Sequence, residues 1–383
     1  MVNIRFLQRV LFAFFLNVSL LVAQDHLGIN RIWAVDDCEK IRQDDLNHPL
    51  AQSSNNPVWN DKRVAIFGAR NEIVAFQVVI ESGKQGAKHV SVSLKSLVGP
   101  AYVIENVTNK RPLTSSVGKR IEIFREHYIR VTKRTRNPSM WWDGARPSDY
   151  YLGPIPDGLI PVEVGTDKGG APFNIEAKQN QGVWVDIYIP RQTPPGQYKG
   201  DLEIRVQTDL VRTIPVELEV HNFDLPDSTH FHNFFFTFSE GISTKHGVRS
   251  FSPAYYSIEQ EYYKMAHRHR MDLSFNQTVD SLDRRASGYY TGEFYTEAYG
   301  YDGPGVGVGN GTYSIGTYDQ PSGRSSGFFP PTKTVWQTAS DKWADWFEKN
   351  VPTTWVLRYM HDEPDSTKYS SIREKAGWIH TNP

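Results

Sequence analysis

The chain of 383 residues is long enough for two domains with sizeable hydrophobic cores. Its 42 lysine and arginine residues nearly balance its 43 aspartate and glutamate residues. The sequence therefore lacks the basic field expected of a protein that binds nucleic acid or an anionic membrane surface. Cys38 is the only cysteine, which excludes an internal disulfide and a metal cluster built on cysteines.

The first residues have the pattern of a signal peptide. Arg5 and Arg9 precede an apolar run from Val10 to Ala23. This run is shorter than the about twenty residues that a membrane-spanning helix needs. We therefore expect residues 1–23 to be cleaved and the mature protein to begin near Gln24. The protein is then secreted, periplasmic or attached to the cell surface, with no transmembrane segment after cleavage.

Residues 26–225 have a β pattern. The segment from Arg70 to Glu81 carries apolar residues on both alternating faces, as a central strand does. Val90 to Leu94 and Val183 to Ile189 alternate between apolar and polar residues, and Pro195-Gly196 has the chemistry of a tight turn. Several such strands separated by turns predict an antiparallel β-sandwich.

Residues 226–383 have the alternation of strands and helices that is typical of a parallel α/β fold. Ser252-Pro253 begins a helix, with Ser252 as the cap and Pro253 in the first turn. We expect Ser287 to Pro331, rich in glycine and tyrosine, to be a long insertion on the loop side. The predicted strands are Phe234 to Phe238, Met271 to Phe275 and Trp355 to Tyr359, and the predicted apolar stripe of the helix is Tyr255, Ile258, Tyr262, Met265 and Ala266.

An acidic pair, Asp362-Glu363, follows the last of these strands. In a β/α barrel, catalytic groups lie at the carboxyl ends of the strands, and an adjacent aspartate and glutamate there could divide the work of cleaving a sugar. The alternative is a helix start, in which Asp362 is the cap and Pro364 lies in the first turn.

Taken together, several motifs resemble glycoside hydrolase family 123 and its uncharacterised relatives over nearly the whole mature chain. The resemblance implies an N-terminal β-sandwich and a β/α-barrel catalytic domain. It further implies a retaining β-N-acetylgalactosaminidase-like enzyme that uses the acetamido group of its own substrate. The motifs are Arg70 to Gln77, Gly153 to Pro161, Pro195 to Gly200, Phe223 to Pro226, Tyr262 to Arg270 and Tyr359 to Pro364.

The resemblance assigns Asp362 and Glu363 as the catalytic residues. In such a mechanism the 2-acetamido oxygen attacks the anomeric carbon, so no nucleophile from the protein is required. Asp362 orients the acetamido group, and Glu363 protonates the leaving oxygen and later deprotonates water. Consecutive strand residues point to opposite faces, so the backbone must bend between His361 and Pro364.

Four further residues are candidates for binding the substrate, a glycan that contains N-acetylhexosamine: Tyr359, His361, Asn276 and Trp336. We expect no cofactor and no metal. His267 and His269 cannot share one helix face at this spacing and are expected at a basic helix end. The glycine-rich segment from Gly303 to Gly311 is expected to be a flexible loop, because a dinucleotide site needs a strand before it and a helix after it.

The second domain is shorter than the about 250 residues of a complete barrel. We therefore expect a partial (β/α)-barrel after the sandwich, in a multidomain β plus α/β protein that shows weak or no hydrolysis in this form. Two functions remain open. One is an exported glycoside hydrolase of the β-N-acetylhexosaminidase type, and the alternative is a non-catalytic carbohydrate-binding or surface protein.

Overall fold

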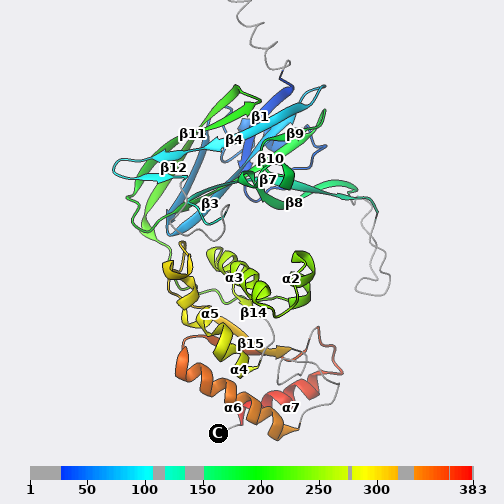
Figure 1. The fold of residues 1–383 in the computed structure, drawn as a ribbon, viewed down its shortest axis with the longest axis vertical. Coiled ribbons are helices and arrows are strands. Elements are labelled where there is room, and N and C mark those ends of the chain that lie inside the picture. Colours follow the sequence, from blue (N-terminus) through cyan, green and yellow to red (C-terminus); the bar gives the residue numbers. More distant parts are fainter. Residues whose placement is uncertain are drawn as a thin grey trace, which may run out of the picture. The chain divides into compact units, whose positions relative to one another are not determined.

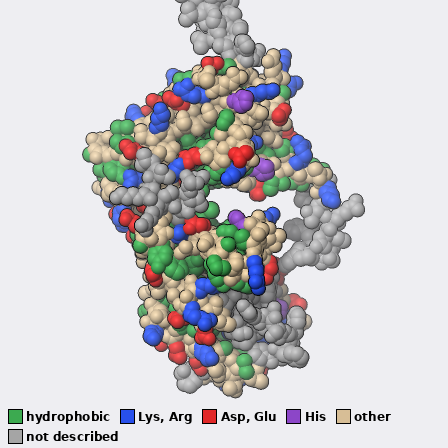
Figure 2. All heavy atoms as spheres, in the orientation of Figure 1, with side chains coloured by type: hydrophobic (Ala, Val, Ile, Leu, Met, Phe, Trp, Pro, Cys, Tyr) green, Lys and Arg blue, Asp and Glu red, His purple; other side chains and the backbone are tan. Residues whose placement is uncertain are grey.

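The computed structural model describes residues 27–106, 117–133, 151–274, 278–317, 332–361 and 363–381. The chain divides into two compact units, which are drawn together in Figure 1 and described separately below. The first unit comprises Met1–Val107 and Lys119–Asp224, and the second comprises Thr108–Gly118 and Leu225–Pro383. On the face seen in Figure 2, acidic and basic side chains are interspersed, as the balanced composition predicts.

The first unit contains two β-sheets. The five-stranded sheet is antiparallel throughout, in the order β1 (Ile29–Asp36), β3 (Glu72–Ser82), β10 (Asn180–Ile189), β7 (Ile121–Val131) and β8 (Gly153–Pro161). The seven-stranded sheet has the order β2 (Val64–Arg70), β12 (Asp209–Asp224), β11 (Gly196–Val206), β4 (Ala87–Leu94) and β9 (Phe173–Ile175). In addition, β5 (Ser96–Val98) pairs with β11, and β6 (Val103–Glu105) pairs with β5. Short 3-10 helices occupy Pro49–Ala51, Ser53–Asn55, Val162–Val164 and Thr166–Lys168.

One hydrophobic core joins the two sheets of the first unit. Phe76 and Val78 of β3 belong to the same buried cluster as Leu202 of β11 and Leu218 of β12. The sheets therefore pack face to face as a sandwich. The central strand expected between Arg70 and Glu81 is present as β3, which pairs with β1 and β10. The seven-stranded sheet differs from the antiparallel expectation at β2, which pairs with β12 in the parallel sense.

The second unit alternates short strands with helices. Its elements in chain order are β13 (Phe235–Phe236), α2 (Ser239–His246), α3 (Pro253–Arg268), β14 (Leu273–Ser274), α4 (Val279–Ser281), a π-helix (Leu282–Ala286), α5 (Ser287–Thr291), 3-10 turns at Glu293–Tyr295 and Glu297–Tyr299, β15 (Thr312–Thr317), α6 (Lys333–Asn350), β16 (Trp355–Tyr359) and α7 (Tyr369–His380). Ser252 caps α3 as predicted, because its side chain accepts a hydrogen bond from the backbone N–H of Tyr255.

The strands of the second unit form two parallel pairs, β13 with β14 and β15 with β16. Polar contacts link the pairs, because Asn310 donates to the carbonyl of Leu273 and the Asp272 carboxylate accepts from the backbone of Gly311 and Thr312. Figure 1 shows α6 and α7 side by side, and Gln337 donates to the carbonyl of Trp378 between them. Closure of these four strands into a partial barrel stays a prediction.

The segment from Ser287 to Pro331 is not the insertion that the sequence suggested, as far as the described residues go. It begins with α5 and contains the strand β15, while residues 318–331 lie outside the described part. The strand Thr312–Thr317 has no continuous apolar run. Its two apolar residues, Tyr313 and Ile315, are buried in the core of the second unit, and the strand pairs with β16. The glycine-rich loop ends at this strand instead of opening a helix, which is not the arrangement of a dinucleotide site.

The buried side of α3 also differs from the expected apolar stripe. Tyr262 and Met265 are exposed, whereas Glu259 and Tyr263 are buried. Glu259 lies on the buried side because it accepts hydrogen bonds at 2.7 Å from Arg285 and at 2.8 Å from the Tyr255 hydroxyl. A pattern built on apolar residues alone misses a buried charge that is paired.

Glu126 of β7 provides a test of the first unit. Its carboxyl is buried over Gly182, where a Cβ would clash with it. Burial raises its pKa from 4.5 to about 7, against the opposing charge of Lys40 and a hydrogen bond with Tyr128. The folded protein therefore holds a proton that the unfolded chain loses above pH 4.5. The resulting stabilisation is full below the unfolded value and is lost as the pH rises through 7.

We therefore predict that the free energy of unfolding of the wild type falls between pH 5 and pH 8 by up to about 3 kcal/mol more than that of Glu126→Gln. Denaturation midpoints at both pH values measure the difference. Glu105→Gln, which changes an exposed glutamate of β6, serves as the control and should keep the wild-type slope. Parallel pH profiles for the wild type and Glu126→Gln would contradict the prediction.

Candidate functional site

The carboxyl end of β16 lies against aromatic side chains from the start of the second unit. The ring of Tyr359 lies 6.4 Å from the ring of Phe234 and 6.2 Å from that of Phe236, measured between centroids. The two phenylalanine rings are 5.1 Å apart and meet edge to face. The sequence predicted a strand over the apolar run from Phe234 to Phe238. The two-residue spacing of the phenylalanines could have indicated that their rings share one face.

The candidate acidic pair follows this aromatic group. Of the two carboxylates, Glu363 is described and exposed, with φ +43°, and Asp362 lies outside the described residues. A positive φ is rare for a residue other than glycine and marks a departure from the extended strand. The bend that the sequence required between His361 and Pro364 is therefore present at Glu363. His361 itself is half-buried.

The helix-start alternative for the acidic pair does not agree with the structure. Helix α7 begins only at Tyr369, and its N-cap position is held by Lys368. Between the pair and the helix, Asp365 forms a turn in which its Oδ1 accepts from the backbone and hydroxyl of Thr367 at 2.9 and 2.6 Å. These hydrogen bonds, with the nearby Lys368 and His361, lower the pKa of Asp365. Asp365 is thus held by its turn, and Glu363 lies in the segment before it.

Trp336 lies on the helix side of β16. It is fully buried, and the guanidinium carbon of Arg358 lies 3.8 Å from its ring centroid. The Nζ of Lys375 lies 5.9 Å from the same centroid. Trp336 therefore offers no exposed ring to a sugar, and its role is to pack α6 against β16 through cation–π contacts. Asn276, the other candidate away from β16, lies outside the described residues.

A polar cavity of about 160 Å³ lies at the opposite, amino ends of the strands. Asp272 before β14, Gly311 before β15 and Thr354 before β16 line it. Burial raises the pKa of Asp272 to about 6, although hydrogen bonds from Gly311 and Thr312 oppose this shift. Catalytic groups of β/α folds occupy the other strand ends, so the cavity does not belong to the candidate site.

His267 also lines this cavity and has a structural environment. Its Nε2 lies 3.0 Å from the carbonyl of Gly305, and its ring is parallel to that of Tyr295 at 3.7 Å. Burial lowers its pKa to about 4, so it is neutral at neutral pH and donates to the carbonyl. His269 is the C-cap residue of α3. The basic helix end is confirmed, but His267 and Arg268 in it are buried rather than solvated.

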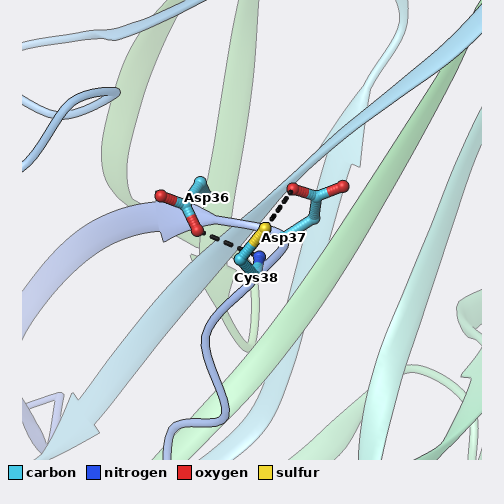
Figure 3. Close-up of side chains that lie close together, drawn as sticks. All are labelled: Asp36, Asp37 and Cys38. Atoms are coloured by element: carbon cyan, nitrogen blue, oxygen red, sulfur yellow. Dashed lines mark hydrogen bonds between the residues drawn. The ribbon is translucent and has the colours of Figure 1, made fainter.

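One group of potential metal ligands occurs in the described part of the chain: Asp36, Asp37 and Cys38, shown in Figure 3. The backbone N–H of Cys38 donates to Asp36, and its thiol contacts Asp37 at 3.7 Å. The charges of Asp37 and Asp36 raise the pKa of the thiol, which disfavours the thiolate that binds metals. Since Asp37 and Cys38 are also exposed, this group is a weak candidate.

The strain at Glu363 leads to a prediction. A side chain in the left-handed region costs about 1–2 kcal/mol, and the flexibility of glycine offsets part of that gain. We expect Glu363→Gly to raise the free energy of unfolding by up to about 1 kcal/mol, measured by denaturant titration. Glu363→Ala, which removes the carboxylate but keeps the Cβ, should give no such gain. Equal stabilities of the two variants would contradict a strained backbone at this position.

Comparisons with known proteins bear on the first unit and on the fold. The family model described as the glycoside hydrolase 123 N-terminal domain matches residues 158–206, which include the Pro195 to Gly200 motif. No curated protein matches the chain. In the described residues, no helix is both long and apolar enough to cross a membrane.

Among solved structures, a family 123 glycoside hydrolase from Clostridium perfringens, from a study of glycolipid glycan hydrolysis, gives a TM-score of 0.50 at 14% sequence identity. The match covers 86% of this chain and 48% of that one, so the chain spans about half the length of this structure. A PapD-like domain of human CEP192 gives a TM-score of only 0.20 at 13% identity, over 43% of this chain and 84% of that one, which is a low similarity. The matched N-terminal-domain model and the shared fold agree with the resemblance inferred from the motifs: the chain is similar to glycoside hydrolase family 123 over residues 158–206 and in its fold.

Proposed function

We propose that this protein is an exported glycoside hydrolase of the β-N-acetylhexosaminidase type. The observation that carries the proposal is the position of Glu363, in a left-handed bend four residues after the end of β16 and before the turn that leads to α7. The fold shared with a family 123 glycoside hydrolase supports a role in glycan hydrolysis. The proposed substrate is a glycan that contains a β-linked N-acetylhexosamine, most simply N-acetylgalactosamine.

The proposed reaction retains the configuration of the sugar and is assisted by the substrate. The 2-acetamido oxygen attacks the anomeric carbon while Glu363 donates a proton to the leaving oxygen. The resulting oxazoline is then opened by water, from which Glu363 removes a proton. Asp362 holds the acetamido N–H and stabilises the positive charge that develops on this group. This chemistry needs no cofactor.

The neighbours of the pair would bind the sugar. Tyr359 is half-buried beside Phe234 and Phe236 and presents an apolar wall on which the C–H face of a pyranose ring can lie. His361 is half-buried between Tyr359 and the acidic pair and can donate or accept a hydrogen bond with a hydroxyl. An apolar wall with a few polar groups is the usual composition of a small-molecule site.

The alternative is a non-catalytic protein that binds carbohydrate. It is favoured by the first unit, which exposes aromatic rings on its seven-stranded sheet. Binding without turnover needs only such rings and hydrogen-bonding groups, whereas hydrolysis needs the carboxylates after β16. The effect of changing these carboxylates therefore distinguishes the two functions.

For a form of the protein with a complete barrel, we predict that Glu363→Gln slows hydrolysis of a β-N-acetylgalactosaminide with an alkyl leaving group by about a hundredfold or more. The loss should be much smaller for a dinitrophenyl leaving group, which departs without a proton. Asp362→Asn should slow both substrates to a similar extent, because it weakens stabilisation of the oxazoline-like state rather than proton transfer. Initial rates with both substrates measure the difference.

The matched control is Glu374→Gln, which neutralises an exposed glutamate of α7 and should leave both rates unchanged. If Asp362→Asn and Glu363→Gln hydrolyse both substrates as fast as the wild type, the acidic pair has no catalytic role. If the wild type turns over neither substrate, the carbohydrate-binding alternative is favoured.

Export gives a separate prediction. The apolar run behind Arg5 and Arg9 should direct the chain out of the cytoplasm and be removed. N-terminal sequencing of the exported protein should therefore begin near Gln24. A variant with Arg5→Glu and Arg9→Glu should be exported less efficiently, because the positive start of the signal is lost. Exported material that begins at Met1 would count against a cleavable signal.

A further inference from the structure

Three aromatic rings lie in a row on the seven-stranded sheet of the first unit. They are Phe67 of β2 and His221 and Phe223 of β12, called the aromatic strip below. The ring centroids of Phe67 and His221 are 5.5 Å apart, and those of His221 and Phe223 are 6.0 Å apart. Phe67 is 70% exposed and Phe223 is 54% exposed. Grouped large apolar side chains on a surface mark sites of interaction more often than single ones do.

The sheet holds the strip toward solvent. In the parallel pair of β2 and β12, Phe67 lies opposite Glu219. Their neighbours Ile66 and Leu218 are buried in the sandwich core. Because side chains alternate along a strand, burial of these neighbours forces Phe67 and Glu219 outward. The strip is therefore displayed by rigid strands, which limits the entropy lost when a ligand binds.

Two carboxylates near the strip, those of Glu217 and Asp224, are paired with basic groups. The Glu217 carboxylate lies 3.1 Å from Arg63 and 3.1 Å from Lys199. Asp224 likewise contacts Arg70 at 2.6 Å and lies 3.7 Å from Arg191. Acidic and basic groups in such close contact largely cancel each other's field at a distance. The basic groups of these pairs are therefore already engaged, and the exposed carboxylate of Glu219 repels an anionic partner.

Hydrogen-bonding groups accompany the rings. The Nδ1 of His221 lies 4.0 Å from the carboxylate of Glu219, and both side chains are partly exposed. A carboxylate accepts hydrogen bonds from hydroxyl groups, and an imidazole can donate or accept them. The strip therefore combines apolar ring surface with polar groups beside it, which is the complement of a sugar with an apolar C–H face and a rim of hydroxyls.

We propose that the aromatic strip is a binding site for an uncharged oligosaccharide. Phe67 and Phe223 contact the C–H faces of the sugar rings, and Glu219 and His221 bind the hydroxyls. The choice of a carbohydrate as the ligand rests on the proposed function, whereas the choice of an uncharged one rests on the paired charges around the strip. The site lies in the first unit and uses none of the residues assigned to hydrolysis.

Affinity electrophoresis of the full chain tests the proposal. The probe is a neutral tetrasaccharide with a terminal β-linked N-acetylgalactosamine, coupled to the gel. A sialylated tetrasaccharide serves as the charged counterpart. All proteins carry Glu363→Gln so that the probe is not consumed. The neutral gel should retard this protein more than the sialylated gel, and the double change Phe67→Ala and Phe223→Ala should weaken binding by about tenfold or more.

Two variants separate binding from folding. Phe67→Tyr with Phe223→Tyr keeps the rings and should retain binding, while Ile129→Ala removes an exposed apolar side chain from the other sheet and should bind like its parent. If the alanine pair does not fold, Glu219→Gln with His221→Ala replaces it and should also weaken binding.

Two results would overturn the proposal. The first is no retardation of the parent by the neutral gel, and the second is equal retardation of the parent and the alanine pair. The readout does not depend on turnover. If the hydrolase assay fails while the strip binds sugar, only the proposed function is rejected. If hydrolysis is observed while the strip binds no sugar, only the binding role of the strip is rejected.

Discussion

The candidate site depends on the alternation of side chains along a strand. On β16, Arg358 stacks on Trp336 at the helix side, while the next residue, Tyr359, lies with Phe234 and Phe236. If this geometry continued past the strand, two adjacent carboxylates would point to opposite faces and could not act on one sugar. The left-handed backbone at Glu363 ends the alternation. Backbone strain of this kind persists where the surrounding structure enforces it, and strained residues are found most often at functional sites.

The second unit is organised around buried polar groups as much as around apolar ones. Glu259 of α3 is tied to Arg285 of the π-helix, and Asp272 accepts hydrogen bonds from the segment that opens β15. Burying a charged group costs free energy unless the group has a partner. Each of these contacts therefore requires two particular elements to lie next to each other. They bring the chain after α5 back to the amino ends of the strands, next to β14. The order of these elements in the second unit thus depends on contacts that an apolar pattern does not reveal.

This explains which elements could be predicted from the sequence. The strand β3 was found because both of its faces are buried, and the start of α3 was found because capping is local chemistry at Ser252 and Pro253. The strand at Thr312–Thr317 was missed because it lacks a continuous apolar run. Trp336 was a candidate for sugar binding because the sequence shows only that a tryptophan is present. It does not show whether the ring packs under an arginine, as it does here, or faces a ligand.

The same distinction applies to the acidic pair. Its position after a strand was evident from the sequence, but the choice between a helix start and a functional loop depended on where α7 begins, which is set beyond the motif. The aromatic strip differs from this loop in its electrostatics. The carboxylates of Glu217 and Asp224 beside the strip are held in ion pairs within the sheet, so they are not placed to donate a proton to a leaving group. Glu363, exposed in a strained bend, has the accessibility that proton transfer to a substrate requires. The proposed glycan-binding surface and the proposed catalytic loop are therefore built from different physical elements of the same chain.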